Sequence, residues 1–251
     1  MRVDELEVRM RELEWFHGLR ALPETWPVIR VDGRGFSKFT EGHFAKPFDA
    51  RFHEIMCSVS ERLLVELQAL YVYTESDEIS VLLPRDTDLF DRELEKLITV
   101  AAGLASATFT QGCGEVAHFD GRLWLGPSAR HVVEYFRWRQ ADATRCCLNG
   151  WCYWTLRKEG FDQTDSTKQL RGKPAPELHD LLFQRGINFN DLPEWQRRGT
   201  GLYWEHYEKA GVNPLTGAAV TAERRRIKRD EALPLGESYD KFVLDRMESG
   251  I

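Results

Sequence analysis

Hydrophobic positions recur along the chain with two periods, one typical of helices and one typical of strands. Apolar residues repeat at steps of three and four in four segments, which predicts helices that each bury one face. These segments are 4–20, 47–67, 89–108 and 128–158. Runs rich in β-branched and aromatic residues predict strands, at 26–31, 70–83 and 115–125. We expect turns inside the last two runs, at 75–77 and at 120–121.

Up to about residue 125 the predicted elements follow the order β-α-β-β-α-β. This is the order of a ferredoxin-like unit, so we predict an α+β fold in which an antiparallel sheet carries helices on one face. The stretch 160–200 is rich in Gly, Pro, Asn and Asp, and only one short helix is predicted there, at 177–183. The C-terminal half is therefore expected to form an extension of the sheet domain.

Length and cysteine content limit the class of protein. The chain has 251 residues, enough for one large domain or a domain with an extension. It has no run of about 18 apolar residues, so we expect no membrane-spanning helix. Its start is acidic and amphipathic, without the apolar stretch of a secretory signal. The five cysteines include no Cys-x-x-Cys pair, which argues against a disulfide framework or zinc ribbon and favours the reducing cytoplasm.

Charge is distributed unevenly along the chain, whose formal net charge is −6. Residues 1–136 hold 15 basic and 23 acidic side chains, whereas residues 137–229 hold 17 basic and 11 acidic ones. The densest basic points are Arg197-Arg198 and the run 224–229. This run is either a solvated helix face or a surface that contacts phosphates.

Two acidic sites stand where short apolar runs end. Asp32 follows the run 26–31, and Asp77 lies at the tip of the next hairpin. Aspartates on neighbouring strands of one sheet can chelate two Mg²⁺ ions around a nucleoside triphosphate, and the carbonyl of Gly33 is a further oxygen ligand. That is the chemistry of a polymerase palm. An Asp-Gly-x-Gly stretch is also typical of a plain β-turn.

The loop after Asp32 has residues suited to phosphate. Gly33 and Gly35 let main-chain N–H groups approach phosphate oxygens, while Arg34 adds a charge and Ser37 a hydroxyl. Lys46 stands before the next helix, within reach of a triphosphate.

The hairpin tip concentrates negative charge. Asp77 and Glu78 follow Ser76 directly, an arrangement that a cation would neutralise. Strand alternation places Ser76 and Glu78 on the face opposite Asp77, so that only Asp77 is expected to share a side with Asp32.

Seven short motifs follow one another in order between residues 25 and 205. They are Val28-Ile-Arg-Val-Asp-Gly-Arg-Gly-Phe36, Lys46-Pro-Phe-Asp49, Ser76-Asp-Glu78, Phe119-Asp-Gly-Arg122, Trp138-Arg-Gln-Ala-Asp142, Gly186-Ile-Asn-Phe-Asn190 and Arg197-Arg-Gly-Thr200. Together they resemble the tRNA-histidine guanylyltransferase superfamily. The chain is most similar to the guanylyltransferase-like branch, whose members are 3′-to-5′ polymerases.

The resemblance implies a palm-like catalytic domain with an N-terminal helix over residues 1–136. Residues 137–251 would be a helical and loop-rich region that completes the nucleotide and RNA sites, separately or within one continuous domain. It implies a nucleotidyltransferase that acts on tRNA, with GTP and ATP as further partners and a homotetrameric assembly. The 3′-hydroxyl of an incoming nucleotide would attack a tRNA 5′ end that carries a triphosphate or an adenylyl group.

The resemblance also implies the site residues. Two Mg²⁺ ions would be held by Asp32, Asp77 and the carbonyl of Gly33. The catalytic residues would be Asp32, Asp77, Ser76 and Glu78. The nucleotide-binding residues would be Gly33, Arg34, Gly35, Phe36, Ser37, Lys46, Asp49, Arg92, Lys96, Asn188, Asn190 and Arg198. Among these, Arg92 and Lys96 would lie near the activating triphosphate, and Asn188, Asn190 and Arg198 beside a second one.

Three departures from the family pattern refine the expected reaction. Histidine-specific members carry His-Ile-Asn-Asn-Leu-Tyr-Asn where this chain has Thr144-Arg-Cys-Cys-Leu-Asn-Gly150, so only Leu148 is shared. This favours template-directed repair of 5′-truncated tRNA over untemplated addition of G. Phe48 replaces a usual Asn. Glu93 replaces a basic residue, which implies a weak or differently aligned ATP activation.

Two other functions stay open at this stage. A palm-fold nucleotidyl cyclase would use the same aspartates on an intramolecular hydroxyl, and an RNA-binding protein would have no catalysis. Residues 137–140 either brace the sheet or contact RNA.

Overall fold

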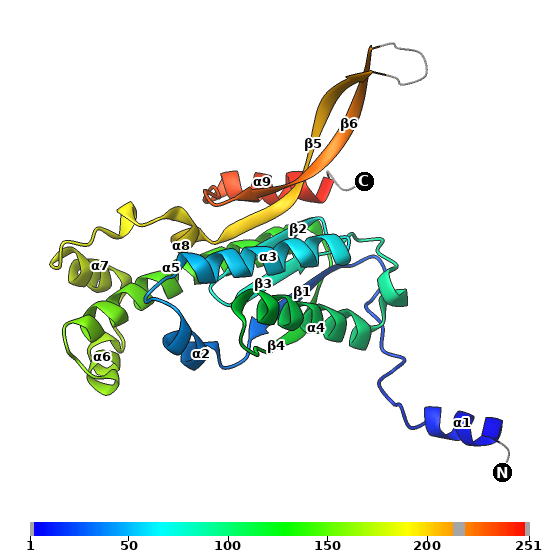
Figure 1. The fold of residues 1–251 in the computed structure, drawn as a ribbon, viewed down its shortest axis with the longest axis horizontal. Helices are drawn as coiled ribbons and strands as arrows, with labels where there is room; N and C mark the ends of the chain where they lie inside the picture. The colour runs from blue at the N-terminus through cyan, green and yellow to red at the C-terminus, as the bar shows by residue number, and fades with distance from the viewer. Residues whose placement is uncertain (1–2, 213–218, 249–251) are drawn as a thin grey trace.

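A six-stranded antiparallel sheet forms the centre of the protein, whose computed structural model describes residues 3–212 and 219–248 (Figure 1). Its strand order is β4-β1-β3-β2-β5-β6. The strands are β1 (Trp26–Gly33), β2 (Tyr71–Glu75), β3 (Glu78–Leu82), β4 (Phe119–Gly126), β5 (Thr200–Val212) and β6 (Ala219–Asp230). The first four strands and two of the helices follow the predicted β-α-β-β-α-β order.

Helices cover both faces of this sheet and enclose two main cores. The helices are α1 (Val3–Arg11), α2 (Phe36–His43), α3 (Ala50–Glu66), α4 (Leu94–Cys113), α5 (Ala129–Lys158), α6 (Gln163–Leu170), α7 (Ala175–Phe183), α8 (Glu194–Arg198) and α9 (Glu237–Glu248). The first core joins α3 and α4 to one face, around Val31 and Leu63. The second joins α5 and α9 to the opposite face, around Tyr71 and Phe136. The predicted fold class is confirmed, and the C-terminal extension covers the face that the palm helices leave open (Figure 1).

The turn predicted at Asp120-Gly121 is wrong, because β4 is one continuous strand. Gly121 pairs with Val31 of β1. A Cβ on Gly121 would lie 3.0 Å from the Cγ2 of Ile98 on α4. The glycine therefore marks a close approach of helix to strand, which the sequence alone does not distinguish from a turn.

The N-terminal helix is shorter than predicted. Residues 4–20 have helical spacing, but α1 ends at Arg11 and buries none of its residues. The apolar side chains of Leu13 and Phe16, which follow it, are 61% and 66% exposed. Helix formation in water depends mainly on packing of the apolar face, and every residue from 4 to 20 is exposed.

The helix predicted from residue 89 begins at Leu94. A single 3₁₀ turn, Leu89–Arg92, precedes it, and Phe90 and Asp91 have positive φ angles of 54° and 52°. A continuous α-helix cannot pass through left-handed residues, so the two segments stay separate.

The C-terminal region consists of short helices and one long hairpin. The helix predicted at 177–183 lies within α7, and α7 packs against α5 in a third cluster that includes Cys152 and Leu182. The expected boundary at 136/137 falls inside α5, which runs unbroken across it. Within the part of the chain that the structure describes, no helix is long and apolar enough to cross a membrane.

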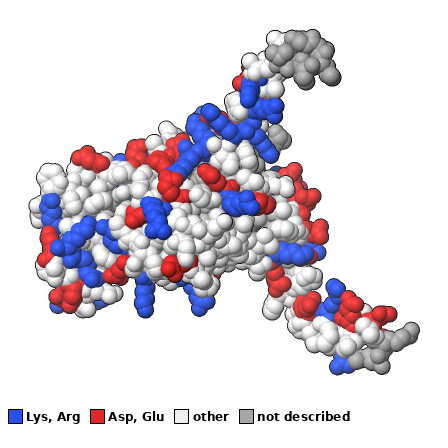
Figure 2. All heavy atoms as spheres, in the orientation of Figure 1, with Lys and Arg blue, Asp and Glu red and all other residues white. Residues whose placement is uncertain are grey.

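The strands β5 and β6 form a hairpin that projects from the body, and the sequence did not predict it (Figure 1). The run 224–229 lies on β6, so it is a strand and not a helix face. Basic side chains gather along the projecting arm (Figure 2). Arg225 packs over the ring of Trp204, and Arg226 packs over Tyr207.

Candidate functional site

Asp32 and Asp77 lie side by side where β1 ends and β2 turns into β3. Asp32 is paired with Glu78 on one side and with Asp120 on the other. The amide of Gly33 donates to the carbonyl of Asp77 at 3.0 Å, which ties the end of β1 to the turn. The structure therefore brings the two predicted metal ligands to one edge of the sheet.

The two carboxyl groups are electrostatically strained. Burial raises the pKa of Asp77, and the negative charge of Asp32 raises it further. Burial also raises the pKa of Asp32, with a further contribution from Asp120. Each carboxylate is thus harder to ionise than in water, and a divalent cation placed between them would reverse this effect.

The predicted alternation at the hairpin tip is wrong for Glu78. Directly paired residues of antiparallel strands share a face, so Glu78 lies on the same face as Asp32. Ser76 has a φ of 49° and forms the turn together with Asp77, and for this reason the strand alternation does not continue through the tip. The Ser76 hydroxyl donates to Oδ1 of Asp77 at 3.0 Å.

The donor set at this edge fits Mg²⁺. Among the described residues, no group of three or more His, Cys, Asp or Glu could hold a metal by itself. Mg²⁺ usually binds through one or two carboxylates and completes its octahedron with substrate phosphates and water. Asp32, Asp77 and the main-chain carbonyl of Gly33 are hard oxygen donors of the right kind and number for such a shared site.

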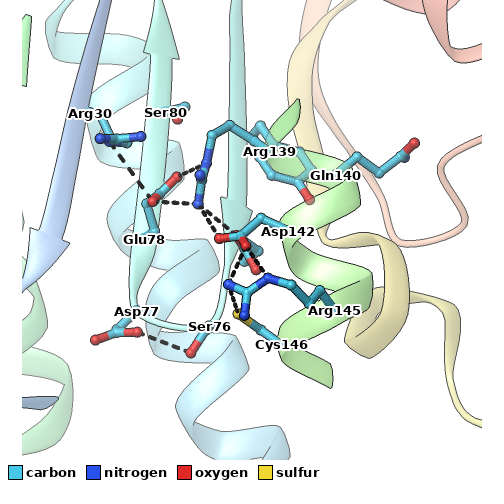
Figure 3. A network of polar contacts seen from close by, with 12 residues as sticks. Arg30, Ser76, Asp77, Glu78, Ser80, Arg139, Gln140, Asp142, Arg145 and Cys146 are labelled. Carbon is cyan, nitrogen blue, oxygen red and sulfur yellow. Dashed lines mark hydrogen bonds and ion pairs between the residues drawn. The ribbon is translucent and has the colours of Figure 1, made fainter. Parts of the chain in front are cut away.

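Glu78 is held by an arginine on the neighbouring helix (Figure 3). Arg139 of α5 donates from Nε to Oε1 of Glu78 at 2.6 Å and from Nη2 to its Oε2 at 2.7 Å. The same Nη2 reaches Glu75 at 3.1 Å and Asp142 at 2.9 Å. Burial and the nearby Glu78 raise the pKa of Glu75 to about 8. Of the two roles open for residues 137–140, Arg139 braces the sheet.

A cavity of about 760 Å³ opens beside Asp77. Its walls come from α2, the 44–49 loop, the hairpin tip, α5 and α8, and this size is typical of small-molecule sites. Four of the predicted nucleotide-binding residues line it: Phe36, Ser37, Lys46 and Asp49. Gly33, Arg34 and Gly35 form the connection that leads from β1 into α2.

Gly33 is required by the packing of that connection. A Cβ on Gly33 would lie 2.4 Å from the ring of Phe36. Phe36 is buried against Phe109 and Phe119, so its ring cannot move aside easily. The glycine lets the chain turn tightly into α2 immediately after the carboxylate.

Lys46 and Asp49 have different roles in the cavity wall. The ammonium of Lys46 donates to the hydroxyl of Thr40. Burial lowers the pKa of Lys46, although the charge of Asp77 opposes this shift. Asp49 caps α3: its carboxylate accepts from the amide of Phe52 at 3.0 Å and from the amide of Ala45 at 2.8 Å.

Arg92 and Lys96 do not reach Asp32 within one chain. Arg92 donates to the carbonyls of Ala21 and Thr87 at 3.1 Å each, next to the start of β1. Lys96 pairs with Glu93 at 2.9 Å. Asp32 lies at the other end of the same strand, so the structure separates these two basic residues from the carboxylates.

The other three predicted residues, Asn188, Asn190 and Arg198, do not line this cavity. Asn188 and Asn190 are exposed, and the side chain of Asn188 accepts from the amide of Asn190 at 3.2 Å. Arg198 pairs with Glu194 at 2.8 Å and donates to the carbonyl of Leu233 at 3.1 Å. The side chains of Asn188 and Arg198 are thus already bonded to the protein itself.

One face of α5 forms a cavity wall that the sequence reasoning missed. Its residues are Ala143, Cys146, Cys147, Gly150, Tyr153 and Trp154. They follow helical steps of three and four, which was the available signal. On the same helix, the indole of Trp151 donates to Oε1 of Gln196 on α8 at 3.0 Å. Because indole only donates, this bond fixes the amide of Gln196 in one orientation.

Comparison with known proteins identifies the family. A family model described as tRNAHis guanylyltransferase matches residues 7–127, and the model of the same family's C-terminal domain matches residues 130–240. The chain belongs to the tRNAHis guanylyltransferase family. It is 34% identical over 193 residues to the tRNA(His) guanylyltransferase of Schizosaccharomyces pombe, with 72% of this chain and 74% of that protein covered. It is 32% identical to the Neurospora crassa enzyme, with 90% and 80% covered.

Solved structures of the tRNAHis guanylyltransferase family share this fold. A bacterial tRNA(His) guanylyltransferase-like protein in complex with GTP superposes with a TM-score of 0.73 at 28% identity, over 97% of this chain and 99% of that one. A bacterial protein of the same description in complex with ATP gives a TM-score of 0.78, over 96% and 98%. The predicted family, the palm-like fold and the nucleotidyltransferase class of enzyme are confirmed.

Because the two carboxylates repel each other, we predict that removing one of them stabilises the metal-free protein and abolishes its response to metal. We expect Asp77→Asn to raise the melting temperature without divalent ions by about 2–4 °C, or about 1 kcal/mol, because it removes the repulsion with Asp32. Millimolar Mg²⁺ should stabilise the wild type but not this variant, as measured by thermal denaturation. Asp86→Asn, on the surface, is the control. A Mg²⁺ response that survives in Asp77→Asn would contradict the placement of the metal.

Proposed function

We propose that this protein is a Mg²⁺-dependent 3′-5′ nucleotidyltransferase that adds nucleotides to the 5′ end of tRNA. The observation that carries the proposal is the meeting of Asp32 and Asp77 beside a cavity that also contains Lys46. The relatives named tRNA(His) guanylyltransferase, and the similar structures in complex with GTP and with ATP, support the same substrates here.

Each residue has a defined task in this mechanism. Asp32, Asp77 and the carbonyl of Gly33 would hold two Mg²⁺ ions, which when bound supply charge neutralisation and a lowered pKa of the attacking hydroxyl. Lys46 would orient the triphosphate from the cavity wall. The 3′-oxygen of the incoming nucleotide forms a bond to the 5′ phosphorus of tRNA as the bond to pyrophosphate, or to AMP, breaks. Ser76 keeps Asp77 oriented through its hydrogen bond.

The role we favour is template-directed repair of 5′-truncated tRNA. The stretch 144–150 departs from the histidine-specific motif, and three of its residues line the cavity. Thr144, which stands where the family has His, donates its hydroxyl to the carbonyl of Arg197 at 2.8 Å. Its hydroxyl proton is therefore used to join α5 to α8, and threonine lacks the imidazole that the histidine-specific motif carries at this position.

The projecting hairpin is the surface that we propose for RNA phosphates. Arg197 and Arg198 form one of the two densest basic stretches of the sequence, but both donate to carbonyls within the protein. Arg224, Arg225 and Arg226 are exposed along β6, where Arg225 lies over the ring of Trp204 and Arg226 pairs with Glu205 of β5 at 2.6 Å. Basic side chains gather along this arm (Figure 2), and they lie on both of its faces because neighbouring residues of a strand point in opposite directions.

We further propose a homotetramer located in the cytoplasm. Arg92 and Lys96 bond to groups of their own chain near the start of β1, at the end away from Asp32, so a second copy would be needed to bring these two side chains to a triphosphate there. The exposed apolar side chains of Leu13, Trp15 and Phe16 form a segment that a partner chain can cover. Glu93 pairs with Lys96, which would weaken any ATP activation that depends on this cluster.

Nucleotide addition should depend on both aspartates. We expect Asp32→Asn and Asp77→Asn to abolish addition because each removes a metal ligand. The assay uses 5′-truncated tRNAs with mono- or triphosphate ends and each of the four nucleotides. Template-matched addition is the expected result for the wild type. Normal addition by either variant would contradict the assignment of that aspartate as a metal ligand. A cyclic product from labelled GTP without RNA would favour the cyclase alternative.

RNA binding should depend on the hairpin. We expect Arg225→Gln combined with Arg226→Gln to weaken tRNA affinity and to reduce the slope of log affinity against log salt by about one to two. Filter binding at several salt concentrations measures both quantities. Arg62→Gln with Arg130→Gln, on helices of the body, is the matched control. An unchanged slope in the hairpin variant would count against this surface.

A further inference from the structure

Arg139 is buried beneath the carboxylates and not exposed to the cavity. It is 5% exposed, although arginine is rarely buried without partners. Its guanidinium bonds to both oxygens of Glu78 and to one oxygen each of Glu75 and Asp142 (Figure 3). One cation thus joins three acidic side chains from two strands and its own helix.

The two glutamates on the sheet bracket the turn that carries Asp77. Glu75 is the last residue of β2 and Glu78 is the first residue of β3, and they are paired in register. Only Ser76 and Asp77 lie between them. A group that fixes both glutamates therefore fixes both ends of the two-residue turn.

Without this cation the tip of the hairpin would carry unbalanced negative charge. Glu78 is paired in register with Glu75 of β2 and with Asp32 of β1, so its carboxyl group has an acidic neighbour on each side. Like charges directly opposite in a sheet destabilise the pairing. Arg30 also lies 3.9 Å from Glu78, but the guanidinium that bonds to Glu75 is that of Arg139.

We propose that Arg139 is a positioning residue for nucleotide addition: by holding Glu75 and Glu78 to α5, it sets where Asp77 presents its carboxylate to metal. This inference rests on the proposed function for its reaction, but its effect on metal binding is separate. Lysine cannot replace this contact, because a point charge lacks the planar fork that meets two carboxylates at once.

The test uses Arg139→Lys in the full chain, with Arg137→Lys as the matched control. Arg137 lies two residues away on the same helix, where it pairs with Asp240 at the surface at 3.3 Å. Mn²⁺ binding is measured by electron paramagnetic resonance in the presence of GTP. The Mg²⁺ dependence of nucleotide addition is measured in parallel, with circular dichroism to establish folding.

We expect Arg139→Lys to weaken Mn²⁺ binding by about tenfold, as outer-shell changes at metal sites commonly do. The Mg²⁺ concentration for half-maximal addition should rise by a similar factor, and saturating Mg²⁺ should restore most of the rate. Arg137→Lys should change neither quantity. A variant that melts earlier but keeps wild-type Mn²⁺ affinity and Mg²⁺ dependence would show a purely structural role and overturn the proposal.

A second variant keeps the test decisive if Arg139→Lys does not fold. Glu75→Met removes one buried carboxylate, leaves the Glu78 contact intact and should weaken Mn²⁺ binding in the same direction. Unchanged affinity in folded Glu75→Met would then refute the inference. If the wild type binds Mn²⁺ in an Arg139-dependent way yet adds no nucleotide to any tRNA, the proposed function fails and the positioning role stands.

Discussion

Repulsion between neighbouring carboxylates is the constraint around which this molecule is organised. The pairing of β1 with β3 and the bond from Gly33 to the carbonyl of Asp77 force Asp32 and Asp77 together, and burial makes the ionised pair costly. Such a cost persists only where the surrounding structure enforces it. A divalent cation with a bound triphosphate would offset this cost. Relief of the repulsion between the carboxylates would therefore contribute to the free energy of metal and nucleotide binding.

The helix α5 links this constraint to the rest of the chain. Arg139, in the N-terminal half of α5, bonds to the glutamates beside the hairpin tip, and the turns that follow it supply Cys146, Gly150 and Trp154 to the cavity wall. Since about 30 residues of helix span about 45 Å, one rigid element connects the sheet, the cavity and the C-terminal helices. The acidic body and the basic hairpin then divide two tasks between them: the body would gather cations and the hairpin would hold RNA.

The sequence predicted what depends on local pattern and missed what depends on distant contacts. The helices α3 and α5 and the strands β1 to β3 have strong periods, and Asp32 and Asp77 follow from where those strands end. β6 has no buried residue, and the described residues of β5 beyond Tyr203 are not buried either, so this hairpin lacks the alternation that marks a strand. The sequence predicts a turn at Gly121, because only the close approach of Ile98 shows why a glycine is needed there. The sequence left residues 137–140 either to brace the sheet or to contact RNA, and because the partners of Arg139 lie 61 and 64 positions away, no local signal could decide between the two roles.

The most direct test of the central claim is a crystal structure with Mn²⁺ and a non-hydrolysable GTP analogue, in which anomalous scattering locates the metal. The account predicts metal peaks within about 2.0–2.4 Å of carboxylate oxygens of Asp32 and Asp77, with the triphosphate completing the coordination. A triphosphate bound elsewhere, or metal that contacts neither aspartate, would contradict it.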